Sequence, residues 1–125
     1  MQAGIKGMLT KTVEQDESAK NLGSGLLDVF ATPALVAFVE KTCWLSVNDF
    51  IEEASTTVGT RMDIKHLKAT PISMEVTCQS ELVKVEGKKL FFEFEVNDEK
   101  DLIAKGSHER YIVDSKSFQE KTDSK

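Results

Sequence analysis

Residues 32–51 read TPALVAFVEKTCWLSVNDFI, and their apolar side chains recur at the spacing of an α-helix. At about 100° per residue these side chains fall on one broad arc. The arc consists of Leu35, Val36, Val39, Cys43, Val47, Phe50, Ile51 and Ala54. Thr32 followed by Pro33 is typical of a helix start, with Thr as the N-cap and Pro at the first helical position. The stretch therefore predicts the one long amphipathic helix of the chain.

A carboxylate lies at the edge of this apolar arc. Glu40 falls between Val47 and Ile51 on the helical wheel. Burying a carboxylate is costly unless it is paired, hydrogen-bonded or protonated. Two interpretations stay open: an edge residue that reaches solvent, or a catalytic carboxylate.

After the helix the apolar period changes from 3.6 to 2, which predicts strands. Apolar and polar residues alternate in four runs, at residues 58–66, 74–82, 90–96 and 102–113. Turn-forming residues separate the runs. An earlier strand is expected within residues 7–14, followed by a loop rich in Gly and Ser over residues 15–31. One-sided alternation is typical of an antiparallel sheet with one buried face. We therefore expect an α+β fold, with one long helix packed on an antiparallel sheet of about five strands.

Length and composition limit the class of protein. A chain of 125 residues is one domain, spanning 1–125, with residues 1–6 and 119–125 expected to fray. A net charge of −5 argues against nonspecific nucleic-acid binding. No apolar stretch is long enough to cross a membrane and none resembles a secretory leader, so a cytoplasmic location is expected. Cys43 and Cys78 lie in apolar patterns without metal-ligand spacing, so neither a disulfide framework nor a metal site is expected.

The predicted sheet is too large for one helix to cover. Long strands with an exposed edge tend to associate unless another chain pairs with them. We therefore expect a homodimer, or a dimer of dimers.

Several short motifs, taken in order, resemble one known family. They are Val29-Phe30-Ala31-Thr32, Glu40, Gly59-Thr60, Thr70-Pro71, Val85-Glu86-Gly87-Lys88-Lys89-Leu90 and Gly106-Ser107-His108-Glu109-Arg110. Over roughly residues 26–120 the chain is similar to the fluoroacetyl-CoA thioesterase family, which has the hot-dog fold. The resemblance implies hydrolysis of a short or small acyl-CoA, with coenzyme A entering only as part of the substrate.

The resemblance also implies roles for individual residues. Thr32, Glu40 and His66 match the family's catalytic set. Leu26, Gly59, Thr60 and Arg110 are expected to bind substrate, although Arg110 could equally be structural. His108 is interpreted as structural or as part of the ligand channel. Leu26 replaces an aromatic lid residue of the best-known member, so the resemblance does not imply a preference for a fluorinated acyl group.

Each implied role has a structural alternative. His66 shares a strand face with Met62 and Ile64, where a lone His can be a core residue or an acid–base group. Eight residues of straight helix span about 12 Å. Thr32 therefore cannot contact Glu40 along one helix, unless the helix start bends or a partner subunit supplies one of the two.

Three functions are compatible with these observations. The favoured one is an acyl-CoA thioesterase, in which Glu40 acts as a general base or as a nucleophile. A non-catalytic acyl-CoA-binding or sensing domain would keep the pocket without turnover. A dehydratase or isomerase would need a different motif near the helix. The basic residues Arg61, Lys65 and Lys68 could bind the coenzyme A phosphates or simply be solvated.

Overall fold

The computed structural model describes all residues of the chain, 1–125. The elements in chain order are β1 (Lys6–Thr12), η1 (Gln15–Glu17), α1 (Ala19–Leu22), α2 (Thr32–Val47), η2 (Asn48–Phe50), β2 (Ser55–His66), β3 (Glu75–Glu86), β4 (Lys89–Asp98), β5 (Leu102–Asp114) and α3 (Ser115–Asp123).

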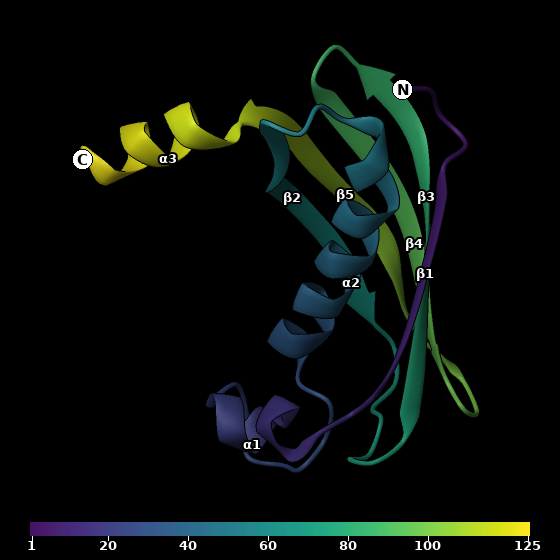
Figure 1. Cartoon of the computed structure of the whole chain (residues 1–125). Helices are drawn as coiled ribbons and strands as arrows, with labels where there is room; N and C mark the ends of the chain where they lie inside the picture. The colour runs from purple at the N-terminus through teal and green to yellow at the C-terminus, as the bar shows by residue number, and fades with distance from the viewer.

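The five strands form one antiparallel sheet in the order β1-β3-β4-β5-β2. Figure 1 shows α2 lying across one face of this sheet, which curves around the helix. The predicted α+β arrangement is confirmed, and each predicted strand is present. β1 and β2 are the two edges of the sheet, so each pairs with only one neighbour.

The core lies between α2 and the sheet. The buried residues of α2 are Leu35, Phe38, Val39, Thr42, Cys43 and Val47. This face is rotated relative to the predicted arc. The helix ends at Val47 and continues as the short turn η2, which leaves Phe50 57% exposed and Ala54 on the surface. The prediction that the helical face continues through Phe50 to Ala54 is therefore wrong.

The start of α2 also differs from the prediction. Ala31 is the N-cap and Thr32 is the first helical residue. Ala31 is buried, its N–H donates to the Glu17 carbonyl, and its own carbonyl accepts from the Leu35 N–H. The Thr32 side chain makes no capping bond. The predicted N-cap role of Thr32 is wrong, and its hydroxyl is available for another partner.

A β-bulge interrupts β2 at Thr60. Gly59 pairs with Arg110, whereas Arg61 pairs with Glu109, so Thr60 is the extra residue. Because side chains alternate along a strand, one extra residue reverses which positions face the helix. The inward side chains are odd-numbered before the bulge and even-numbered after it. The predicted alternation of residues 58–66 holds only beyond the bulge.

Two segments have more regular structure than the sequence indicated. The predicted loop 15–31 contains η1 and the single turn α1, which Ser18 caps through its hydroxyl. Residues 119–123, which are expected to fray, belong instead to α3, which is capped by the Asp114 carboxylate. α3 extends away from the sheet beyond the end of β5 and has no buried residue (Figure 1). No helix of the chain is both long and apolar enough to cross a membrane.

Candidate active site

A hydroxyl–imidazole pair joins the start of α2 to the end of β2. Thr32 Oγ1 lies 2.8 Å from Nδ1 of His66. The other ring nitrogen, Nε2, is buried and has no hydrogen-bond partner in the single chain. Burial lowers the pKa of His66 below its ordinary value of 6.5, and the Lys68 backbone carbonyl opposes this effect only in part. His66 is therefore neutral at pH 7 and can accept the Thr32 hydroxyl proton at Nδ1.

A cavity of about 360 Å³ opens beside this pair. Its walls are formed by Ala19, Ser24, Val29, Phe30, Ala31, Thr32, His66, Leu67, Lys68 and Ala69. Six of these ten residues are hydrophobic, and the Thr32 hydroxyl lies among them, an arrangement with the mixed lining of a small-molecule pocket. Leu26 is 90% exposed and does not line this cavity, so its predicted role in substrate binding stays a prediction.

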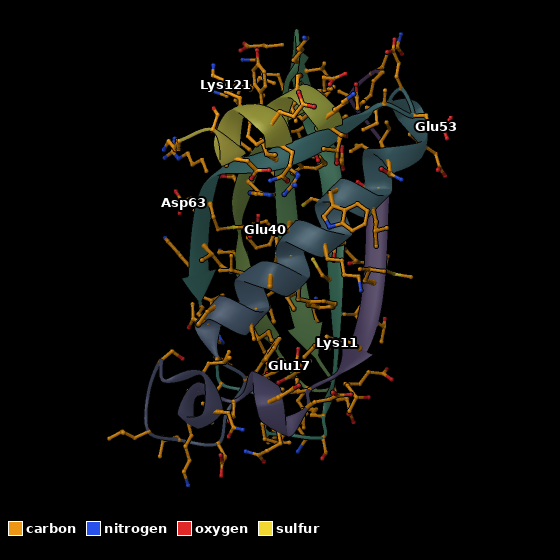
Figure 2. All side chains as sticks on the ribbon, turned by 60° about the vertical axis from the view of Figure 1, so that its left-hand side comes forward. Lys11, Glu17, Glu40, Glu53, Asp63 and Lys121 are labelled. Atoms are coloured by element: carbon orange, nitrogen blue, oxygen red, sulfur yellow. The ribbon has the colours of Figure 1, made fainter.

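Glu40 lies halfway along α2, on the side of the helix nearer to β2 (Figure 2). Its Oε2 is 3.3 Å from Nη1 of Arg110 and 3.9 Å from Nε2 of His108. The Glu40 side chain is 39% exposed. The carboxylate is therefore an ion-paired group at the edge of the core that still has access to water.

Arg110 is buried and held in a single orientation. Nε donates to Oγ1 of Thr57 at 2.8 Å, and Nη2 donates to the Thr57 carbonyl at 2.9 Å. Nη1 is shared between the Glu40 carboxylate and His108 Nε2, which is 3.1 Å away. Burial lowers the pKa of Arg110 below its ordinary value, and the Glu40 carboxylate opposes this lowering only in part. A planar guanidinium fixed at three nitrogens presents a constant positive charge to Glu40.

Gly59 packs directly against this carboxylate. A β-carbon at position 59 would lie 2.6 Å from Oε2 of Glu40 and 3.4 Å from Nη1 of Arg110. Only glycine leaves room for the ion pair. The hydroxyl of the neighbouring Thr60 donates to the Glu109 carbonyl at 3.1 Å, which ties the bulge to β5.

The predicted catalytic residues thus form two groups in one chain. Thr32 and His66 form one pair, and Glu40 belongs to a second cluster with Gly59 and Arg110. α2 is continuous from Thr32 to Val47, so about 12 Å of helix separates Thr32 from Glu40. The single chain does not bring all three predicted catalytic residues together.

His108 is the residue whose place in this cluster the sequence did not reveal. It is 2% exposed and contacts Arg110 within the cluster. The available signal was its position two residues before Arg110 on one strand, which places both side chains on the same face. The contact with Glu40 could not be foreseen, because 68 or more residues separate the two groups along the chain.

The proposed phosphate-binding residues are all on the surface. Arg61 lies 3.8 Å from a Glu109 carboxylate oxygen, and Lys68 lies 3.0 Å from one of Asp101. Lys65 belongs to a groove on the outer face of the sheet. Only Lys68 also lines the cavity beside Thr32 and His66, so it is the best placed of the three to meet a phosphate.

Comparisons with known proteins agree with this architecture. The family model of the fluoroacetyl-CoA-specific thioesterases matches residues 13–116. The fluoroacetyl-CoA thioesterase of Streptantibioticus cattleyicolor is 33% identical over 94 residues, covering 75% of this chain and 68% of that protein. The structure of the fluoroacetyl-CoA thioesterase FlK matches with a TM-score of 0.95 at 27% identity, covering 100% of this chain and 97% of that one.

A more distant structure supports the fold alone. A hot-dog-like protein from Thermanaerovibrio acidaminovorans matches with a TM-score of 0.87 at 19% identity, covering 96% of this chain and 89% of that one. The fold is therefore the hot-dog fold, here in a hydrolase of thioesters. The chain belongs to the fluoroacetyl-CoA-specific thioesterase family.

Proposed function

We propose that this protein hydrolyses a small acyl-CoA thioester to the free acid and coenzyme A, with Thr32, His66 and Glu40 as the catalytic residues. The observation that carries this assignment is the 2.8 Å contact between the Thr32 hydroxyl and a half-buried, neutral His66 beside a cavity with hydrophobic residues in its walls. A hydroxyl whose proton can pass to a neighbouring imidazole is suited to attack or polarise a thioester carbonyl.

The elements around the cavity fit the charges that develop during this reaction. Thr32 is the first residue of α2, where the free backbone N–H groups and the positive end of the helix dipole favour an oxyanion. Glu40 either activates water as a general base or attacks the carbonyl itself, forming an anhydride that water then opens. In both routes water supplies the oxygen of the acid, and its proton goes to the coenzyme A thiolate.

We further propose that the complete site is shared between two copies of the chain. β2 is an edge strand, and its inward side chains Met62, Ile64 and His66 are only half-buried in the single chain. Antiparallel pairing of β2 with its copy, about a two-fold axis at Asp63, would oppose inward residues to inward ones and, across the bulge at Thr60, set Gly59 beside the partner's His66. The Glu40 cluster of one chain would then lie beside the Thr32–His66 pair of the other.

The acyl group is proposed to be small. The cavity of about 360 Å³ lies at the lower end of the usual size range for ligand pockets. The relatives named above act on fluoroacetyl-CoA, a two-carbon acyl thioester. Leu26 has no aromatic ring where the best-known member has an aromatic lid residue, so acetyl, propionyl and fluoroacetyl groups are all candidates.

Release of free thiol from a panel of acyl-CoAs, from acetyl to long-chain and aromatic, tests the proposal. We expect turnover of a short acyl-CoA and a loss of about 100-fold or more in kcat for Glu40→Gln, which keeps the shape of the side chain and removes its charge. Glu95→Gln is the matched control, because Glu95 lies on the outer face of the sheet. Near wild-type turnover by Glu40→Gln would rule out the role given to Glu40.

The same panel separates the alternative function. A protein that binds acyl-CoA but releases no thiol from any member would be a binding or sensing domain rather than an enzyme. The ion pair of Glu40 with Arg110 favours the enzyme, because a pocket that only binds an apolar acyl group has no use for a buried guanidinium beside a carboxylate.

A further inference from the structure

His108 is a deeply buried polar side chain near Glu40, and the reaction as described does not use it. It is 2% exposed, and its ring stacks against Phe92 of β4 with a centroid distance of 6.2 Å. Both of its ring nitrogens have partners. Nδ1 lies 2.7 Å from the Arg61 carbonyl and Nε2 lies 3.1 Å from Nη1 of Arg110.

These two partners determine where the ring proton is. A carbonyl oxygen can only accept a hydrogen bond, so Nδ1 of His108 carries the ring proton and donates a hydrogen bond to the Arg61 carbonyl oxygen. A guanidinium can only donate, so Nε2 has no proton and accepts from Arg110. The contacts therefore define one neutral tautomer, with the proton on Nδ1.

This tautomer matters for Glu40. If Nε2 carried a proton, it would face Glu40 Oε2 at 3.9 Å and compete with Arg110 for the carboxylate. It would also place two donors, Nε2 and Nη1, against each other. The groups around His108 are Arg110 on its own strand, Glu40 on α2 and the nearby Glu109. Burial and the Arg110 charge lower the pKa of His108, while the Arg61 carbonyl and the two carboxylates raise it, with a net lowering.

We propose that His108 is a positioning residue, whose unprotonated Nε2 anchors Nη1 of Arg110 so that the guanidinium orients the Glu40 carboxylate. Thr57 fixes Nε and Nη2 of the same guanidinium from β2. His108 fixes the remaining nitrogen, the one that reaches Glu40. This inference rests on the proposed function, because it gives Arg110 a task in the reaction of Glu40.

The tautomer of His108 can be determined by NMR in the absence of substrate. The chain contains two histidines, so a ¹⁵N–¹H correlation spectrum of the ring nitrogens shows two ring systems, and His66→Asn leaves only that of His108. We expect a protonated Nδ1 and an unprotonated Nε2 at pH 7. An Nε2–H tautomer or an imidazolium at that pH would overturn the proposal.

Two variants separate positioning from simple packing. His108→Gln can place an acceptor oxygen near the position of Nε2, whereas His108→Asn can keep only the donor toward the Arg61 carbonyl. We expect kcat to fall about tenfold or more in His108→Asn with KM little changed, and to be largely retained in His108→Gln. Equal losses in both variants, in proportion to their loss of thermal stability, would show a packing role and overturn the proposal.

The two measurements also distinguish this inference from the proposed function. If the wild-type protein released no thiol, the proposed thioesterase function would be wrong. The spectrum would still show whether His108 Nε2 is unprotonated and can accept from Arg110. If the wild-type protein hydrolysed acyl-CoA but His108 carried its proton on Nε2, the proposed function would hold. Only the positioning role of His108 would then be wrong.

Discussion

Gly59 and Glu40 are in such close contact that a β-carbon at position 59 would lie 2.6 Å from the Glu40 carboxylate. The contact joins the edge strand β2 to the middle of α2. It also places the backbone of β2 next to the charged group proposed to carry the reaction. A substitution at either residue acts directly on the other.

Gly59→Ala is therefore expected to reduce activity far more than stability. The atom that must move is the end of a flexible side chain, so the fold can absorb the added methyl group. Displacing the carboxylate by about 1 Å is nevertheless enough to lower kcat by about 100-fold. Thiol release and thermal unfolding of the same sample measure the two effects separately.

Gly106→Ala provides the contrasting case. A β-carbon at position 106 would lie 1.9 Å from the Asp63 backbone oxygen, which cannot move without separating β2 from β5. We expect this variant to be strongly destabilised, by about 3 kcal/mol or more, because a clash with backbone has no low-cost relief. Comparable melting temperatures for the two variants would contradict this interpretation of Gly59.

Thr32→Val tests the hydroxyl at the start of α2. The helix is capped by Ala31, so the loss of the hydroxyl should leave α2 intact and cost about 1 kcal/mol or less through the lost contact with His66. We expect turnover to fall by about 100-fold if the hydroxyl reacts or polarises the carbonyl. Thr32→Ser keeps the hydroxyl and should retain activity. Wild-type kcat in the Val variant would exclude a chemical role for Thr32.

Mixing two inactive variants tests whether the site is shared. If Thr32 and His66 of one chain act with Glu40 of the other, a heterodimer of Thr32→Val and Glu40→Gln contains one intact site and one doubly altered site. Random mixing yields half heterodimers, so about one quarter of wild-type activity should return. The co-refolded mixture must first be shown to be dimeric, with a mass of twice 13.9 kDa. If this dimeric mixture recovered no thioesterase activity, each chain would hold a complete site.

Stability should decrease as the pH falls below about 6.5. Burial lowers the pKa of both His66 and His108, so below the ordinary histidine value the unfolded chain binds more protons than the folded chain. The stability gained by keeping both histidines neutral is fully present above the ordinary histidine pKa. It is lost as the pH falls toward the lower pKa values of the folded chain. The melting temperature should therefore be lower at pH 5.5 than at pH 7.5, at roughly constant ionic strength.

The variant lacking both histidines is the control for this effect. His66→Gln combined with His108→Gln removes both titrating rings, so its melting temperature should change less over the same pH range. A pH dependence as steep as that of the wild-type protein would show that other groups are responsible.

Local patterns in the sequence were sufficient for most of the fold. The 3.6-residue period of residues 32–51 and the period of 2 in the later strands predicted α2 and β2–β5, because both depend on near neighbours in the chain, although α2 ends at Val47. α3 was missed because its residues are almost all polar and none of them is buried, so no apolar run marks it in the sequence. Likewise, the cap at Ala31 rather than Thr32 follows from contacts with Glu17, which no local pattern records.

For the candidate site, the sequence by itself determined which residue types are present, and its resemblance to a known family gave Thr32, Glu40 and His66 as candidates. Only the tertiary structure decided how they are grouped. The bulge at Thr60 arises from the pairing of β2 with β5, and it turns Gly59 toward Glu40 and His66 toward Thr32. The partner of Glu40 is Arg110, 70 residues further along the chain. Contacts of that kind depend on strand register and on the packing of α2 across the sheet, which are set by the whole fold rather than by neighbouring residues.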